Sequence, residues 1–344
     1  MTRTRQLLLA VGLYILVPLI SVEAIVRWSG WADHLYTDGG LYEMSPSGNY
    51  WRFRPGFVGT TLGPTSVRIG PHGSRLHGTA GAQSRATVAI FGDSFTFGQG
   101  VADEQTFVAR IEARLVEAGV LAKVLNFGVP GHTLEMEIAH LGERLEEIRP
   151  DAVVLAFPSM DLDPRRAENH VDRYGYLTKR VFGPPSPTLD FARLMLRQSR
   201  TALLVKHRIL QLTQRRPFAA EPQDRVEPSL HSALTRYKEA IQRFIEATPS
   251  TKRIVICLDL RESPLSLEVH NVMDEQFPEL EYLHAPSAFD LPPGLELRVP
   301  LDGHPNAIAH RTFAEMLVDP LLSALQAEAD SESSAARPGT PIAR

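Results

Sequence analysis

The fold of this chain is constrained most by a series of short apolar runs that alternate with amphipathic stretches from residue 86 onwards. Strands buried on both faces have this composition, and the runs cover 86–92, 122–128, 151–157, 252–260 and a possible fifth at 280–285. Helical spacing covers the intervening 105–118, 133–148 and 229–247. The alternation predicts an α/β fold, a three-layer α/β/α sandwich with a mainly parallel sheet that binds ligands at the carboxyl ends of its strands.

The N-terminus carries a membrane-targeting segment. Two arginines among the first five residues precede an uncharged apolar run over 7–20, and Glu23 follows shortly after it. Counted over 6–27, the segment reaches the length of about 20 residues that a membrane-spanning helix needs. By the positive-inside rule, residues 1–5 form a cytoplasmic stub, and the main domain is extracytoplasmic, in a periplasm or at the cell surface.

Two other interpretations of this segment stay open. A cleaved signal peptide ranks second, because Val22 and Ala24 form a weak small-x-small cleavage signal that Glu23 and Ile25 make poor. A buried helix of a globular domain ranks third, because basic residues precede the run and no polar face appears at helical spacing. We therefore expect a retained transmembrane anchor.

Composition divides the remainder of the chain into three parts, the second of which contains an insertion. Residues 28–85 are rich in Gly, Pro and aromatic residues, which predicts an extracytoplasmic N-terminal region of short strands and turns. The main domain covers 86–326, and a helical insertion at about 165–250 separates its third and fourth strands. Small polar residues dominate 327–344, which predicts a disordered tail.

The insertion contains a basic stretch, 191–216, that has seven Arg or Lys residues and no acidic residue. Its apolar residues recur at helical spacing, which predicts one amphipathic helix. Such a helix can serve as a lid, as a face toward a membrane or as a grip on an anionic polymer. A solvated basic face over an apolar core stripe is the commoner arrangement and is the one we expect here.

Charge and cysteine content exclude several classes of function. The formal net charge of −4 provides no overall basic field that would attract nucleic acid, so we expect no nucleic-acid partner. Cys257 is the only cysteine, so neither an intrachain disulfide nor a CxxC site can form. It lies in the apolar run IVICLDL, where a thiol usually fills the core.

Ser94 lies in IFGDSFTFGQG, directly after a predicted strand and between small residues. A serine at the carboxyl end of a sheet strand is well placed to act as a nucleophile. The alternative is a structural role, in which Ser94 caps the following helix. The GxSxG elbow of α/β-hydrolases is absent.

Asp302 and His304 stand in VPLDGHPN, a loop that precedes a helix beginning near Pro305. If this loop also lies at the carboxyl edge of the sheet, His304 can take the proton of Ser94 while Asp302 fixes its tautomer. A metal site made of Asp302, His304 and His310 is the alternative, and no HExxH or comparable ligand spacing supports it.

Together these motifs resemble the SGNH hydrolases, also called the GDSL esterase and lipase family, over about residues 86–325. The resemblance implies a flavodoxin-like sheet without a metal or other cofactor, and a nucleophile at Ser94 with Asp302 and His304 completing the triad. It also implies an oxyanion hole made by the backbone amides of Ser94 and of Gly131 in NFGVPGHT.

The third block of the family, Gly-x-Asn-Asp, is degenerate here. AFPSMDLD places Pro158 at the glycine and Met160 at the asparagine, and retains only Asp161. A thioether cannot donate a hydrogen bond, and losing one oxyanion donor typically costs about 10²–10³ in kcat. Ser159 and Asn126 are the nearest candidates for a replacement donor by sequence.

The resemblance implies a serine esterase or acylhydrolase that acts on an ester of a cell-envelope glycan or lipid. Two alternatives stay open: a transferase that moves an acyl or acetyl group to a polysaccharide, and a catalytically impaired glycan-binding module. The expected partners are therefore an acylated glycan or lipid and the membrane, and the sequence does not indicate an oligomeric state.

Overall fold

The computed structural model describes residues 3–61, 66–77, 84–164, 169–179, 187–213, 230–249, 251–289, 296–299 and 302–335. Its centre is a five-stranded parallel sheet with the strand order β11-β10-β7-β5-β6. The strands are β5 (Ala86–Gly92), β6 (Ala122–Gly128), β7 (Ala152–Phe157), β10 (Lys252–Cys257) and β11 (Glu281–His284). The predicted α/β class and all five strands, including the possible fifth, are confirmed.

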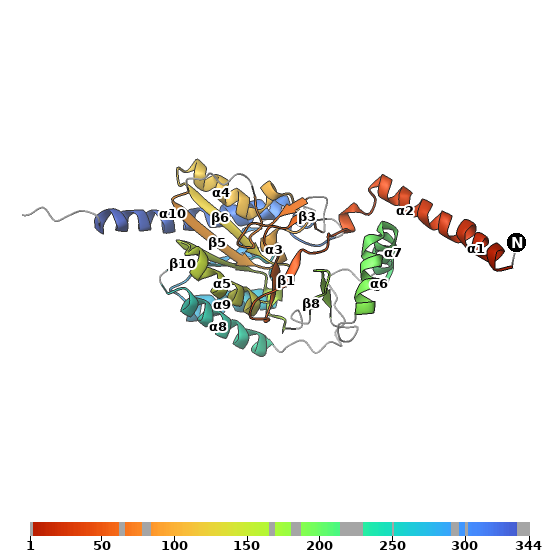
Figure 1. Ribbon diagram of the computed structural model, residues 1–344. Helices are drawn as coiled ribbons and strands as arrows, with labels where there is room; N and C mark the ends of the chain where they lie inside the picture. Colours follow the sequence, from red (N-terminus) through yellow and green to blue (C-terminus); the bar gives the residue numbers. More distant parts are fainter. Residues whose placement is uncertain are drawn as a thin grey trace, which may run out of the picture.

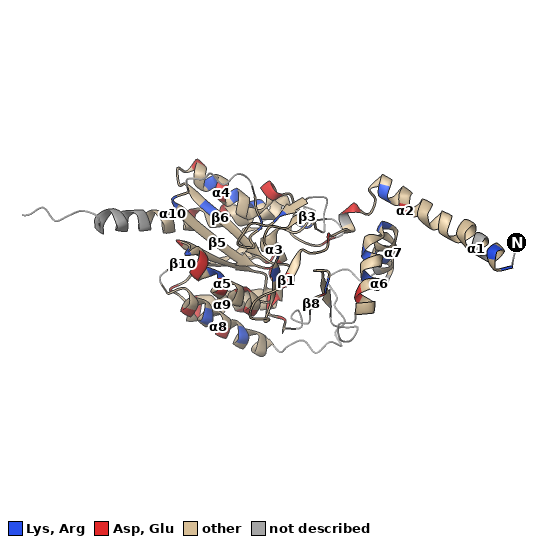
Figure 2. Ribbon diagram, in the orientation of Figure 1, with Lys and Arg blue, Asp and Glu red and all other residues tan. Residues whose placement is uncertain are grey.

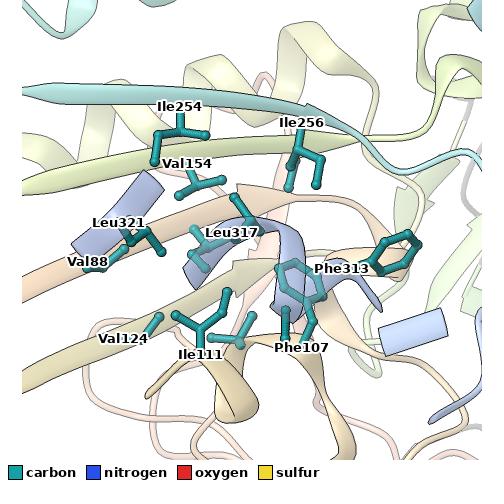
Figure 3. Close-up of a cluster of buried hydrophobic side chains, with 14 of the residues drawn as sticks. Val88, Phe107, Ile111, Val124, Val154, Ile254, Ile256, Phe313, Leu317 and Leu321 are labelled. Carbon is teal, nitrogen blue, oxygen red and sulfur yellow. The ribbon is translucent and has the colours of Figure 1, made fainter. Parts of the chain in front are cut away.

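Helices cover both faces of this sheet, as predicted (Figure 1). One face packs against α4 (Phe107–Glu117) and α10 (Ala307–Ala335), and the other packs against α5 (Leu134–Ile148), α8 (Leu230–Ala247) and α9 (Pro264–Gln276). Alternate residues of each strand serve the two faces, so that Val88 joins the cluster drawn in Figure 3 while Phe91 lies in the opposite layer. Apolar residues at consecutive positions are therefore required.

The strand order places a topological switch point between β5 and β7. From β5 the chain first moves outward to β6, and it then returns to β7 on the other side of β5. Ligands of such sheets bind where the order reverses, outside the carboxyl ends of the strands. Ser94 follows β5 and therefore lies at this point.

The N-terminal region forms two small antiparallel hairpins, as its composition predicts. These are β1 (Tyr42–Met44) with β2 (Trp51–Phe53), and β3 (Val58–Thr60) with β4 (Ser66–Arg68). Phe53 and neighbouring apolar residues pack against Phe97 and Val129, next to the ends of β5 and β6. The region therefore supports the carboxyl edge of the sheet.

The basic stretch of the insertion differs from the prediction of one helix. It forms α6 (Pro187–Gln198) and α7 (Arg200–Thr213), and its last three residues, 214–216, lie outside the described residues. The break falls at Ser199, because its hydroxyl accepts the backbone N–H of Ala202 and so caps the second helix. Before it comes a short hairpin of β8 (Asn169–Val171) and β9 (Leu177–Lys179).

The N-terminal segment forms α1 (Arg3–Val11), a π-helical turn (Gly12–Leu16) and α2 (Val17–Ser29). Among the described residues one helical stretch, Gly12–Ser29, is long and apolar enough to cross a membrane. It extends away from the α/β domain in Figure 1. By length and composition it fits either a membrane anchor or a signal sequence.

The C-terminal helix is longer than predicted. Helix α10 continues to Ala335, so residues 327–335 are helical where we predicted disorder. Alanine and glutamate in this stretch favour helix even without a packed core. The rest of the predicted tail, 336–344, lies outside the described residues.

Candidate active site

The turn after β5 presents Ser94 at the start of α3 (Ser94–Phe97). Asp93, and not Ser94, is the N-cap of this helix, and its Oδ1 accepts the backbone N–H of Phe95 at 2.7 Å. Gly92 allows the backbone of β7 to approach closely, because a Cβ there would lie 2.1 Å from the carbonyl oxygen of Ala156. Helix capping therefore does not account for the serine.

Ser94 and His304 are 210 residues apart in sequence and within hydrogen-bonding distance in space. The His304 Nε2 lies 2.9 Å from the Ser94 Oγ, and its Nδ1 lies 3.0 Å from the Asp302 Oδ1. A neutral ring protonated at Nδ1 donates to Asp302 and leaves Nε2 free to accept the serine proton. The three residues that the sequence identified are thus brought together in the order that nucleophilic catalysis needs.

A short backbone turn makes the Asp-x-His spacing work. Gly303, between the two side chains, has φ +85°, a left-handed conformation that favours glycine. The turn is held because the Val299 N–H donates to the carbonyl of His304 at 2.7 Å. The Asn306 Oδ1 then caps α10 by accepting the backbone N–H of Ile308.

Two further polar side chains contact this group. The Gln99 Nε2 donates to the Asp302 Oδ1 at 3.4 Å, and the Ser94 Oγ also lies 3.1 Å from the Asp93 Oδ2. A hydroxyl carries one proton, so Ser94 donates either to Asp93 or to His304 at any moment. Nucleophilic attack requires the second arrangement.

Gly131 lies in the turn after β6, next to the carboxyl end of β5. It has φ +81°, and the turn closes through a hydrogen bond from the His132 N–H to the carbonyl of Val129. The His132 Nε2 donates to the backbone carbonyl of Trp51 at 2.7 Å, and the Trp51 indole donates to the carbonyl of Pro130 at 3.1 Å. Burial lowers the pKa of His132 to about 4, so this ring is neutral near pH 7.

The loop after β7 forms a short 3₁₀ helix, Ser159–Leu162, and carries no amide side chain at the position of Met160. Met160 is 44% exposed, whereas the Ser159 N–H donates to the Asp259 Oδ1 at 3.0 Å. The Asn126 side chain donates to the carbonyl of Thr96 at 3.0 Å. Both replacement donors suggested by the sequence are therefore occupied with other partners.

The structure brings two residues to this edge that the sequence analysis missed. The Asn169 Nδ2, on β8, lies 3.4 Å from the point where a Cβ on Gly131 would stand. Arg75 is buried, and its guanidinium donates to the carbonyls of Phe97 and Gly98 at the C-terminal end of α3. Neither residue lies in a recognisable motif, and no sequence pattern pairs the insertion with the turn after β6.

The alternative of a metal site finds no matching cluster in the described part of the chain. No group of three or more His, Cys, Asp or Glu side chains in that part could hold a metal ion. The His310 Nδ1 accepts the backbone N–H of Phe107 at 3.2 Å, and its ring stacks on Phe107. Burial lowers the pKa of His310 to about 3, so this ring is a neutral part of the core.

The comparisons with known proteins agree with the sequence motifs. The profile of the GDSL-like lipase/acylhydrolase family matches residues 90–311, which include both Ser94 and His304. A lipase/acylhydrolase from Enterococcus faecalis is 16% identical, with 69% of this chain and 95% of that chain covered and a TM-score of 0.42.

A catalytic mutant of an acetylxylan esterase from Geobacillus stearothermophilus is 15% identical, with 69% of this chain and 94% of that chain covered and a TM-score of 0.40. No curated protein matches the sequence.

Proposed function

Because this chain belongs to the GDSL-like lipase/acylhydrolase family, we propose that it is a serine esterase in which Ser94 is the nucleophile. The observation that carries the proposal is the continuous hydrogen-bonded chain from the Ser94 Oγ through both nitrogens of His304 to Asp302. Such a chain lets one imidazole move a proton in each half of the reaction.

In the first half of the reaction, the Ser94 Oγ attacks the ester carbonyl while the His304 Nε2 takes the hydroxyl proton. Asp302 stabilises the imidazolium that forms. Collapse of the tetrahedral intermediate breaks the ester C–O bond, His304 gives its proton to the leaving alcohol, and Ser94 stays acylated. A water, activated by His304 in the same way, then hydrolyses the acyl-enzyme and releases the acid.

Negative charge on the tetrahedral oxygen needs hydrogen-bond donors. The proposed donors are the backbone amides of Ser94 and Gly131 and, in place of the amide that Met160 lacks, the side chain of Asn169. The position of the Asn169 Nδ2 beside Gly131 supports this assignment. Donors fixed before the reaction stabilise the transition state without reorganisation.

The proposed substrate is an ester on a cell-envelope glycan or lipid. Support comes from the apolar helix near the N-terminus and from the arginines before it, which favour retention in a membrane with the α/β domain outside the cytoplasm. A retained anchor keeps the chain in the membrane fraction after a carbonate wash. Recovery of a soluble chain that begins near residue 25 would instead show a cleaved signal.

A catalytically impaired glycan-binding module is the competing function, and Met160 at the donor position favours it. Hydrolysis of a short acyl ester by the purified chain, with Ser94→Ala as control, decides between them. Turnover that requires Ser94 supports the esterase. In a transferase, a polysaccharide hydroxyl replaces water in the second half of the reaction. When a polysaccharide is added to the same assay, an acylated glycan among the products therefore identifies a transferase.

A further inference from the structure

The α6–α7 hairpin is tied to the apolar N-terminal helix through one carboxylate. Glu23, within α2, accepts the Ser199 hydroxyl at 2.9 Å and the backbone N–H groups of Arg200 and Thr201 at 2.9 and 3.0 Å. Glu23 thus caps the start of α7 and is itself paired with Arg27 at 2.7 Å. A charge that would be costly inside an apolar segment is satisfied by the hairpin.

This contact lies inside the apolar stretch and not beyond it. Glu23 precedes the end of that stretch at Ser29 by six residues, which corresponds to about 9 Å of helix rise. If α2 crosses a membrane, the start of α7 therefore lies beside the outer part of the spanning segment, near the boundary between hydrocarbon and headgroups.

The exposed face of the hairpin is apolar, which contradicts the predicted solvated basic face over a core stripe. Seven large apolar side chains of α6 and α7 are between 45% and 62% exposed: Leu189, Phe191, Met195, Leu196, Val205, Ile209 and Leu212. Exposed apolar surface of this extent on one element marks an interaction site.

Two arginines of the hairpin, Arg197 and Arg200, hold it to the rest of the protein. Arg197 forms an ion pair with Asp172 at 2.8 Å, and Arg200 lies over the ring of Tyr36 and pairs with Asp33 at 3.3 Å. Since these cations are already paired, they do not form a free grip for an anionic polymer. The hairpin is fixed in place with its apolar side outward.

Helix α2, which contacts α7, also exposes large apolar side chains. Leu19, Ile20 and Ile25 are exposed, and Trp28 at the end of α2 is 90% exposed. Tryptophan favours the interface between membrane and water. In Figure 2 the mostly tan ribbon of α2 lies beside α7, on which Lys and Arg are blue. Lys206 is exposed on α7 and can contact anionic headgroups.

The edge of the sheet that carries Ser94 faces the same side. In Figure 1, α3 lies on the side of the sheet toward β8, α6–α7 and α2, whereas α10 extends away on the opposite side. The β8–β9 hairpin bridges this edge and α6, because Asn169 lies beside Gly131 and Asp172 binds Arg197.

We propose that the exposed apolar face of α6–α7 lies in the headgroup region of the membrane that α2 crosses, and that this contact keeps the Ser94 edge directed toward the bilayer. The proposal rests on the membrane anchor of the proposed function and deepens it. It assigns esters held at the membrane surface, such as acyl lipids or lipid-linked glycans, as the substrate class.

The test uses the full chain in nanodiscs of phosphatidylcholine and phosphatidylglycerol that contain doxyl-labelled lipid. A dye is attached to a single introduced cysteine at Leu196→Cys or Leu212→Cys, since the native Cys257 is buried. Val116→Cys is the matched control, because Val116 is 48% exposed on α4, away from the hairpin. Leu19→Cys on α2 reports the anchor alone.

Doxyl lipid should quench the dye at positions 196 and 212 nearly as strongly as at position 19, and should leave it unchanged at position 116. Quenching at position 19 with none at 196 and 212 would overturn the hairpin proposal. No quenching at position 19 would refute the anchor, and with it the membrane site of the hairpin. Neither result depends on esterase activity.

A second measurement keeps the proposal testable through function. The double variant Leu196→Ser/Leu212→Ser should hydrolyse a soluble short ester at the wild-type rate and an acyl lipid in vesicles about tenfold more slowly. Val116→Ser is its control and should change neither rate. Equal activity of the double variant and the wild type on the vesicle substrate would contradict a role of the hairpin at the membrane.

Discussion

The turns after β5 and β7 lie at neighbouring carboxyl ends of one sheet, yet they are built differently. After β5, Asp93 caps α3 and the Ser94 Oγ lies 2.9 Å from His304. After β7, Met160 is exposed and the Ser159 amide is held by Asp259. Proton transfer and oxyanion stabilisation are separate tasks, so the groups for one can come from two loops of the sheet edge, while one of the donors proposed for the other comes from a distant insertion.

The largest loss of activity is expected when a residue that takes part in proton transfer is replaced. Ser94→Ala and His304→Ala should each lower kcat/KM for a short acyl ester by about 10⁴-fold or more, because each removes a group that acts in the chemical step. The double variant should be no worse than either single one, since the two act as a unit. Thermal unfolding of each variant is the control and should be nearly unchanged.

Activity that survives in Ser94→Ala would rule out the serine mechanism. It would also reopen the metal alternative at Asp302 and His304.

The next effect concerns the residue that orients the imidazole. Asp302→Asn should cost less than either substitution above, about 10²–10³-fold in kcat, because it stabilises the tautomer and the imidazolium without touching the substrate. Gln99 already donates to the same carboxylate, which is partly exposed, so the ring keeps part of its orientation. A loss as large as that of His304→Ala would show that Asp302 does more than orient the ring.

Oxyanion stabilisation is tested by removing the proposed replacement donor, Asn169. Asn169→Ala should lower kcat by up to about 10²–10³-fold with little change in KM, because a donor aimed at the tetrahedral oxygen acts mainly in the transition state. Asn169→Asp cannot donate and should behave alike, whereas Asn271→Ala on the distant α9 should have no effect. A kcat within twofold of wild type in Asn169→Ala would remove Asn169 from the proposed hole.

The smallest effect is a gain. Met160→Asn should raise kcat by about tenfold or less, below the full worth of one donor, because Pro158 restricts the loop and Met160 points partly into solvent. The same substitution should restore more activity when it is combined with Asn169→Ala. If Met160→Asn lowers activity both in the wild type and in Asn169→Ala, a side chain in the loop after β7 does not reach the negative charge that develops on the tetrahedral oxygen.

The strands could be predicted from the sequence because their physical signal is local. Ala86–Gly92 and Ala122–Gly128 were identified to the residue, since burial on both faces demands apolar side chains at consecutive positions and glycine ends each run. The pairing of Ser94 with His304 was predicted from their places next to a strand end and a helix start, and the resemblance to the family supported it. The left-handed Gly303 that makes the Asp302 spacing work is visible only in the structure.

Other parts of the site could not be predicted because they depend on long-range contacts. Nothing in the sequence near Asn169 indicates that β8 lies beside Gly131, or that Arg75 supports the C-terminal end of α3. The orientation of α6–α7 was predicted wrongly for a related reason. Helical periodicity shows that a helix has an apolar face, but it does not show whether protein or another apolar phase covers that face.

The central claim, that His304 activates Ser94 for attack, is tested most directly by covalent labelling with a fluorophosphonate. Attack by the Ser94 Oγ on phosphorus forms an O–P bond and releases fluoride, while His304 takes the hydroxyl proton. Mass spectrometry should find the label on Ser94, should find none in Ser94→Ala, and should find much slower labelling in His304→Ala. No label on Ser94 in the wild type, or equal labelling in His304→Ala, would contradict the claim.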